Sequence, residues 1–219
     1  MKARNKKRII IALFAFFAVL MYLLSAVRIS AFDEGFYASF FRAKDIYASL
    51  PDADARAGNL LGYIKEGSEL NPAFFNEKET AHMKDVKTLF SLSAVLLMIS
   101  MLFCFGIIAY AFFKRDISLM AHCLIAGGIA SLSFVLVLVL LSINFQWVFE
   151  KFHTIFFSNS LWLMNPETDR IIVLLPESFF RLIARRIFLT SAVLSFGMLA
   201  AGLLVKYMEK KLYGILQHN

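Results

Sequence analysis

The sequence predicts an all-α, polytopic membrane protein, a bundle of four transmembrane helices with two extracellular interfacial segments. Hydrophobic residues make up 59% of the 219 residues and charged residues 18%, whereas a soluble domain carries about 45–50% and about 25%. The apolar residues also gather in four charge-free runs, each as long as the roughly 17–25 residues that a membrane-spanning helix needs. At this length we expect a single membrane domain over residues 1–219.

The four predicted spans cover about residues 9–28, 88–113, 118–141 and 187–206. The first follows the basic stretch MKARNKKR, as in a signal peptide, but its apolar core is too long and lacks a small-residue cleavage site, so we expect a retained helix. The third charge-free run continues to Phe149, which is longer than one span. We therefore expect its helix to end near Leu141 and the next residues to bend along the interface. Gly127 and Gly128 permit close helix packing.

Lysine and arginine predict the orientation, because cytoplasmic loops carry an excess of both. They flank the N-terminus, the loop between the second and third spans, and the tail, and are Lys2, Arg4, Lys6, Lys7, Arg8, Lys114, Arg115, Lys206, Lys210 and Lys211. Only Asp116 and Glu209 oppose them there. Both termini are therefore predicted to be cytoplasmic, and the segments at about 29–87 and 142–186 to lie on the outer face. We attribute the net charge of +7 to topology rather than to nucleic-acid binding.

The first outer segment opens with an aromatic pattern. Phe32, Phe36 and Phe40 recur every four residues, with Tyr37 and Phe41 beside them. This spacing predicts a helix that lies in the headgroup plane with one aromatic face. Such a face can be an aromatic anchor or a substrate groove, and the sequence leaves both open.

The chain has only four histidines, and two of them flank predicted spans on the outer face. His82 lies shortly before the second span, and His153 lies shortly after the third. Ionisable residues at this depth are costly unless they have a function, so the two form a candidate site. For His122, near the cytoplasmic end of the third span, and for His218, in the tail, we expect structural roles.

No metal or other cofactor is predicted. Catalytic zinc takes three protein ligands, and the sequence has no HExxH or HxH motif and no cysteine near the two histidines. Two histidines can ligate haem, but such ligands usually come from the middle of helices, whereas these two lie at helix ends. Cys104 and Cys123 lie inside predicted spans without CxxC spacing, and we expect buried, unreactive thiols.

Two neutral imidazoles at a boundary between water and lipid are suited to moving protons near neutral pH. Residues near them can supply two other groups used in acyl transfer, namely hydrogen-bond donors for an oxyanion and a carboxylate that orients an imidazole. Asn159 and Arg170 can donate hydrogen bonds to a developing oxyanion. Asp85, three residues after His82, or Glu177 can orient an imidazole.

Aromatic residues of the second outer segment can lie against acyl chains at headgroup level, among them Trp162, with Phe156 and Phe157. Structural interpretations stay open for single residues here. Trp162 can be a plain membrane-belt residue, Asn165 with Pro166 can form a turn, and Asp169 with Arg170 can form a surface pair. The combination of these residues with the two histidines favours a functional site.

Residues 152–180 carry the pattern FHxxFFxNxxWxxNPxxDxxIxxLPExFF, and HMxDVK precedes the second span. With four spans in this orientation, the chain resembles the bacterial lipoprotein intramolecular transacylases, an integral membrane family. The resemblance covers nearly the whole chain and is specific over residues 79–87 and 152–180. It departs at Asn165, where the family more often has Asp.

The resemblance implies an acyltransferase of the bacterial cell membrane, with its active site at the surface of the outer leaflet. Its substrate is a lipoprotein whose N-terminal cysteine carries an S-linked diacylglyceryl group. The enzyme moves the sn-2 acyl chain to the α-amino group of the same cysteine and leaves a lyso-form lipoprotein. His82 and His153 fit this reaction as catalytic residues. The implied partners are diacylglyceryl-modified lipoproteins and membrane lipids, with no cofactor and no nucleic acid.

An α-amine has a pKa of about 7.7–8.0 and must lose a proton before it attacks. In one hypothesis one imidazole takes that proton while the other protonates the leaving sn-2 oxygen. In another, one imidazole accepts the acyl chain covalently before passing it on. The sequence leaves this choice open, together with the identity of the base. It also leaves open a non-catalytic accessory or structural membrane protein, and a haem-binding membrane protein.

Overall fold

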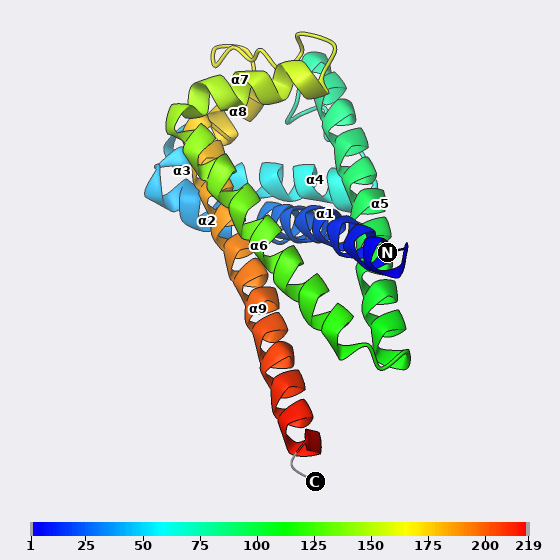
Figure 1. Cartoon of the computed structure of the whole chain (residues 1–219). Helices are drawn as coiled ribbons and strands as arrows, with labels where there is room; N and C mark the ends of the chain where they lie inside the picture. The colour runs from blue at the N-terminus through cyan, green and yellow to red at the C-terminus, as the bar shows by residue number, and fades with distance from the viewer. Residues whose placement is uncertain (1, 218–219) are drawn as a thin grey trace. The chain divides into compact units, whose positions relative to one another are not determined.

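The computed structural model describes residues 2–217 and, within them, the side chains of residues 4–212, so that His218 lies outside the described residues. Over this range the chain is all-helical, as predicted (Figure 1). Its elements are α1 (Lys2–Ala31), α2 (Glu34–Ala43), α3 (Ile46–Ser49), α4 (Ala53–Glu66), α5 (Glu77–Phe113), α6 (Ile117–Leu141), the 3₁₀ turn η1 (Ser142–Asn144), α7 (Phe145–Phe156), α8 (Arg170–Leu174) and α9 (Glu177–Gln217).

Four helical stretches of the described chain are long and apolar enough to cross a membrane. They cover Arg4–Ala31, Glu77–Phe113, Ile117–Phe156 and Glu177–Leu212. Each contains one predicted span, so the prediction of four membrane-spanning helices is confirmed.

The residues form two compact units. The first unit combines the described parts of Met1–Val27, Ala94–Leu140 and Ile187–Asn219, and the second combines Arg28–Ser93 with Leu141–Arg186. Both histidines of the candidate site belong to the second unit.

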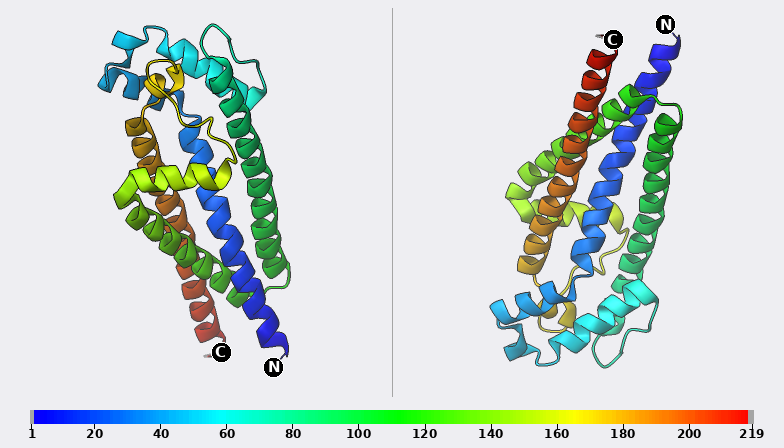
Figure 2. Two further views of the ribbon diagram at one scale, coloured as in Figure 1. Left: turned by 90° about the horizontal axis from the view of Figure 1, so that it is seen from above. Right: turned by 90° about the horizontal axis from the view of Figure 1, so that it is seen from below.

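Small residues allow the helices of the first unit to approach closely (Figure 2). A Cβ added at Gly128 on α6 would lie 2.7 Å from the Cβ of Leu199 on α9, which is closer than any normal contact. A Cβ added at Gly202 on α9 would lie 2.8 Å from the backbone nitrogen of Ile125 on α6. Glycine therefore sets the separation of these two helices from both sides, as expected for Gly128.

Helix α1 is joined to its neighbours in the first unit by apolar and ionic contacts. The rings of Phe17 on α1 and Phe103 on α5 have centroids 4.4 Å apart. The Lys7 ammonium lies 2.6 Å from the carboxylate of Asp116, which also accepts the backbone N–H of Leu119 in the first turn of α6. One carboxylate thus caps α6 and binds α1.

The third apolar run bends where the sequence predicted. Helix α6 ends at Leu141, the turn η1 follows, and α7 starts at Phe145. The side chain of Asn144 accepts the backbone N–H of Trp147 at 3.2 Å and so caps α7. Helix α7 leaves large apolar side chains uncovered, with Trp147 48% and Ile155 73% exposed. This is typical of a helix that lies against lipid.

The core of the second unit is aromatic. The Phe179 ring packs against Phe36, Tyr37 and Phe40 of α2 with centroids 5.5, 4.9 and 5.2 Å apart. The Tyr37 hydroxyl donates to the Ala31 carbonyl at 2.9 Å, so its polar end is also satisfied.

This core corrects the expectation for the aromatic face of α2. Tyr37, Phe40 and Phe41 are 7%, 3% and 0% exposed, and Phe32 and Phe36 pack against the same cluster. Aromatic rings that are buried inside the protein serve neither as a membrane anchor nor as a substrate groove. The four-residue spacing predicted the aromatic face of the helix, but its expected place in the headgroup plane is wrong, because other parts of the protein cover it.

Candidate active site

Helix α5, which carries His82, begins with a reciprocal cap. The Asn76 side chain accepts the backbone N–H of Glu79 at 2.9 Å, and the Glu79 carboxylate accepts that of Asn76 at 2.8 Å. This is a capping box. The second oxygen of Glu79 accepts the backbone N–H of Ile171 in α8 at 2.6 Å. One carboxylate, fully buried, therefore caps the starts of two helices.

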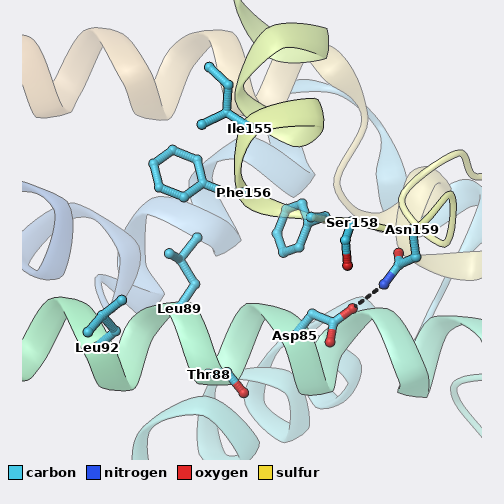
Figure 3. Close-up of a pocket in the computed structure, with 9 residues that line it drawn as sticks. Asp85, Thr88, Leu89, Leu92, Ile155, Phe156, Ser158 and Asn159 are labelled. Carbon is cyan, nitrogen blue, oxygen red and sulfur yellow. Dashed lines mark hydrogen bonds between the residues drawn. The ribbon is translucent and has the colours of Figure 1, made fainter.

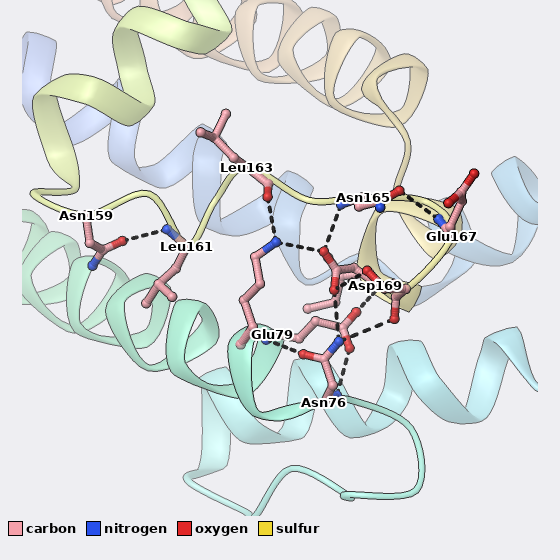
Figure 4. Close-up of polar contacts among 11 residues, drawn as sticks. Asn76, Glu79, Asn159, Leu161, Leu163, Asn165, Glu167 and Asp169 are labelled. Carbon is pink, nitrogen blue, oxygen red and sulfur yellow. Dashed lines mark hydrogen bonds and ion pairs between the residues drawn. The ribbon is translucent and has the colours of Figure 1, made fainter.

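Asp169 organises the loop between α7 and α8 (Figure 4). Its carboxylate is 2% exposed and accepts hydrogen bonds from the Asn76 amide and the Lys78 ammonium, both at 2.9 Å, and from the Asn165 backbone N–H at 2.8 Å. Lys78 also donates to the Leu163 carbonyl at 2.6 Å. The hydrogen bond from Asn165, followed by that from Lys78, lowers the pKa of Asp169 well below its ordinary value. The loop is thereby tied to the start of α5.

The loop contains one of the two structural features expected from its sequence. Asn165 and Pro166 do form a turn, in which the Asn165 side chain accepts the Glu167 N–H at 3.0 Å. The surface pair of Asp169 with Arg170 is wrong, because Asp169 is buried and pairs with Lys78.

The two histidines predicted to be catalytic face each other. His82 lies near the start of α5 and His153 in the last turn of α7, and each is 8% exposed. Their ring centroids are 6.2 Å apart and their planes are inclined by 30°. Residues 71 positions apart in sequence thus bring two imidazoles together in a largely enclosed setting.

The hydrogen bonds of the rings differ. Nδ1 of His153 lies 2.7 Å from the Phe149 carbonyl. Because a carbonyl only accepts, this Nδ1 carries the proton, and Nε2 of the neutral ring holds the lone pair. Nδ1 of His82 is buried and has no hydrogen-bond partner among the described residues. Buried polar atoms without a partner are rare, and such an atom in an imidazole pair is typical of a reacting or ligand-binding group.

Aromatic rings surround the imidazoles. Trp162 stacks on His153 with centroids 4.8 Å apart and planes inclined by 28°. Phe149 lies 4.2 Å from His153 on another side. The Phe157 ring lies 5.1 Å from His82 and 5.6 Å from His153. The Trp162 predicted to lie near acyl chains is therefore in contact with a histidine of the pair.

Both imidazoles lie outside the predicted spans at 88–113 and 118–141. Burial, followed by the proximity of His153, lowers the pKa of His82. Burial also lowers the pKa of His153. At neutral pH both rings are therefore neutral, and each has a lone pair that can accept a proton.

The remaining predicted residues fall into two groups. Asp85 and Asn159 meet, since the Asn159 amide donates to the Asp85 carboxylate at 2.8 Å. Arg170, by contrast, is exposed at the first position of α8, and the Glu177 carboxylate pairs with Arg181 one turn further along α9. In the described chain, the hydrogen bonds of Asp85 and Glu177 thus go to Asn159 and Arg181 and not to an imidazole.

Sequence reasoning missed the residues that support the site, namely Asn76, Lys78, Glu79 and Asp169. One signal was available, because Asn76 followed three positions later by Glu79 is a capping-box pattern just before an apolar run. Lys78 and Asp169 carry no such local signal, since they are 91 residues apart. Over the described chain, no group of three or more His, Cys, Asp or Glu is arranged to hold a metal ion.

The fold and the site define the class of protein, a helical integral membrane protein with a buried pair of imidazoles suited to proton transfer. Comparison with known families gives a match over residues 12–180 to the lipoprotein intramolecular transacylase Lit. The chain belongs to this family and is an acyltransferase that acts on lipoproteins. Family membership favours the enzyme over the accessory and haem-binding interpretations.

Solved structures agree in fold. The membrane integral lipoprotein intramolecular transacylase Lit from Bacillus cereus superposes with a TM-score of 0.78 at 21% identity, covering 98% of this chain and 99% of that chain. Two structures of the same protein with one histidine replaced, by arginine or by alanine, give TM-scores of 0.82 and 0.81 at 20% identity. They cover 95% and 96% of this chain, and 96% and 97% of theirs. The comparison with curated proteins gave no match.

Proposed function

We propose that this acyltransferase moves the sn-2 acyl chain of an S-diacylglyceryl-cysteine to the α-amino group of the same cysteine. The reaction takes place at the surface of the outer leaflet of the bacterial cell membrane, with both termini in the cytoplasm. The observation that carries this proposal is the buried imidazole pair. Nδ1 of His82 has no partner in the part of the chain that the structure describes, and Nε2 of His153 holds a lone pair. Membrane lipids surround the site, and neither a cofactor nor nucleic acid takes part.

The transfer exchanges one bond for another within a single molecule. The α-amine nitrogen attacks the sn-2 ester carbonyl, closing a ring of about eight members, which is favourable when the protein restricts the conformers. The N–C bond forms, the bond between the carbonyl carbon and the sn-2 oxygen breaks, and one proton moves from nitrogen to that oxygen. The products are an amide and a free hydroxyl.

The two imidazoles share this proton movement. His153 accepts the proton of the attacking nitrogen at Nε2, because its Nδ1 proton is held by Phe149. His82 gives a proton to the sn-2 oxygen, and the proton taken up by His153 returns to His82 through water, which restores the pair. A general acid or base of this kind contributes about 10²–10⁴ in rate.

The role proposed for Asn159 is to stabilise the negative charge that develops on the carbonyl oxygen. Its amide group has two N–H donors, and one of them is used by Asp85. We assign the other to the oxyanion, where a donor of this type is worth about 10²–10³ in rate. We assign no step to Arg170 and Glu177, since Arg170 is exposed and Glu177 is paired with Arg181.

The experiment is to express the chain in a bacterial host without its own lipoprotein N-acyltransferase and to analyse the N-terminal lipopeptide of a reporter lipoprotein by tandem mass spectrometry. We expect an N-acyl, S-monoacylglyceryl cysteine. The control is the chain with both His82→Ala and His153→Ala, which should leave the diacylglyceryl form with a free amine. If the parent chain inserts into the membrane and also leaves that form untouched, the proposal is wrong. An acyl-imidazole trapped on His153 would replace direct transfer by the covalent route.

A further inference from the structure

A pocket of about 280 Å³ opens beside the imidazole pair, between α5 and the end of α7 (Figure 3). Helix α5 contributes Asp85, Thr88, Leu89 and Leu92, and the chain from Ile155 to Asn159 forms the opposite wall. Phe157 belongs to this wall and also contacts both imidazole rings, so the pocket adjoins the proposed reaction centre.

The two ends of the pocket differ in chemistry. Figure 3 shows the Asp85 carboxylate, the Ser158 hydroxyl and the Asn159 amide together at one end. Leu89 and Leu92 lie at the other end, with Ile155 and Phe156 across from them. A ligand that fits both ends has a polar or charged group joined to an apolar chain.

The Asp85 carboxylate is available to a cation. One of its oxygens accepts the Asn159 amide, and the ion pairs of the described chain do not include Asp85. Two of the neighbouring lysines are engaged elsewhere, since Lys78 is bound to Asp169 and the Lys87 ammonium lies 4.1 Å from the centre of the Tyr63 ring, whereas Lys84 is exposed. Asp85 is therefore a half-buried carboxyl group, held in place by Asn159, with room for a positive group from outside the chain.

The apolar end is open to a lipid chain. Leu92, Ile155 and Phe156 are 55%, 73% and 53% exposed. Large apolar side chains gathered at the mouth of a pocket are typical of a binding site for an apolar partner. The volume is just below the roughly 300–1,000 Å³ of pockets that enclose drug-sized ligands, so this pocket suits one end of a lipid rather than a whole diacylated cysteine.

We propose that this pocket recognises the free N-terminus of the substrate, with the α-ammonium bound to Asp85 and the start of one acyl chain lying along Leu89 and Phe156. The inference rests on the proposed function and adds to it a basis for selectivity. With a pKa of about 7.7–8.0, the α-amine is mostly protonated at neutral pH and is attracted by a carboxylate. Asp85 lies three residues after His82 on α5, so the bound ammonium is on the same side of the helix as the imidazole.

The same contact distinguishes substrate from product. The bound ammonium first releases one proton to water, and acyl transfer then converts the neutral amine into an uncharged amide, which no longer forms an ion pair with Asp85. The pocket therefore binds the lipoprotein before the reaction and loses its charged contact afterwards, which favours release of the product. An amine that is already acylated is discriminated against for the same reason.

The experiment measures binding without turnover. The ligands are two synthetic peptides whose N-terminal cysteine carries an S-linked glyceryl group with ether-linked chains, which cannot be transferred, one with a free α-amine and one N-acetylated. Their affinities for the full chain in detergent micelles are compared at pH 7. We expect the free amine to bind about tenfold more tightly or better, as for a charge-assisted hydrogen bond.

The variants decide the role of Asp85. Asp85→Asn should abolish the preference for the free amine, and Asp85→Glu should restore part of it, which shows that the protein is folded. The control Glu150→Gln removes an exposed carboxylate of α7 outside the pocket and should keep the full preference. If Asp85→Asn retains the preference, or if the parent chain binds both peptides equally, the inference is overturned.

This test is separable from that of the proposed function. If the protein prefers the free amine through Asp85 but leaves the reporter lipoprotein unmodified, the ammonium site is supported and the proposed reaction is wrong. If the protein modifies the reporter but binds both peptides equally, the reaction is supported and the ammonium site is wrong.

Discussion

Different interactions stabilise the interior of each of the two units. In the first unit, close helix packing at Gly128 and Gly202 dominates, and the ion pair of Lys7 with Asp116 joins α1 to the start of α6. In the second unit, an aromatic core around Phe179 is combined with hydrogen bonds between residues far apart in sequence, such as the one from Ile171 to Glu79 across 92 positions. Packing of small residues suits helices in lipid, where apolar surface gains little from burial.

The two units also differ in their buried ionisable residues. Buried carboxyl groups are found in the second unit, at Glu79 and Asp169, together with the two buried imidazoles. In the first unit, the described histidine, His122, is exposed on α6 and bonded to the Ser118 carbonyl of its own helix. A reacting group needs a position that is held from several sides, and the polar network of the second unit provides it. If this view is correct, equivalent substitutions in the two units should have different consequences.

The largest contrast is expected among the histidines. With a purified chain and a synthetic diacylated lipopeptide, His82→Ala and His153→Ala should each lower the transfer rate by about 10²–10⁴. His122→Ala, the matched control, should keep nearly the parent rate. The product is measured by mass spectrometry over time.

The pH dependence of the parent sharpens this prediction. Because the pKa values of His82 and His153 are lowered, the acid side of the rate profile should be set by protonation of the pair at a pH below the ordinary 6.5 or so of histidine. A loss of rate in His122→Ala as large as in His153→Ala would contradict the distinction between the units.

The next largest effect concerns the support of the site. Asp169→Ala should lower the free energy of unfolding by about 3 kcal/mol, because it leaves the donors of Asn76 and Lys78 without their buried acceptor. Since the folded pKa of Asp169 is lowered, its contribution is present above about pH 3.9 and is lost as the pH falls further. Thermal unfolding in detergent micelles measures both.

The control for this prediction is Asp54→Ala. Asp54 is an exposed carboxylate that accepts the Tyr47 hydroxyl at 3.0 Å in the same unit. Its loss should change stability by no more than about 0.5 kcal/mol. Equal unfolding temperatures for the two variants would show that the Asp169 network has no special role.

The smallest effect is expected in the first unit. Gly128→Ala places a methyl group 2.7 Å from Leu199 and should destabilise the protein by about 1–3 kcal/mol. Gly106→Ala, on α5 with no atom within 4 Å of the added Cβ, should be neutral or stabilising by up to about 1 kcal/mol. The folded fraction of Gly128→Ala should still transfer acyl chains at the parent rate, because the site lies in the other unit. A rate loss at full folding would instead couple the helix packing to the chemistry.

The sequence predicted the spans well because a membrane helix is a local pattern. The charge-free runs and the helix end at Leu141 depend on residues that are near one another in sequence. The close approach at Gly128 depends on the small size of glycine. The two histidines were also found, since few ionisable residues lie beside the spans. Their assignment as catalytic residues, and the topology of the termini, stay predictions to be tested.

The surroundings of the site were less predictable. Asp169 is buried in contact with Lys78, which lies 91 residues earlier. A local sequence pattern does not predict a contact between residues so far apart. For the same reason the aromatic face of α2 was expected to lie in the headgroup plane, although Phe179, far away in sequence, covers it. Asp85 was expected to serve an imidazole, and its hydrogen bond with Asn159 depends on a contact across 74 positions.

The double cap at Glu79 has a consequence for the making of the protein. Glu79 is translated 92 residues before Ile171, and at about 5–20 residues per second the interval is roughly 5–20 s. During this time the second span can already be inserted, while the carboxylate next to it still lacks the backbone N–H of α8. The start of α5 therefore reaches its final form only after most of the polypeptide has left the ribosome, and the imidazole of His82 acquires its neighbours late in biogenesis.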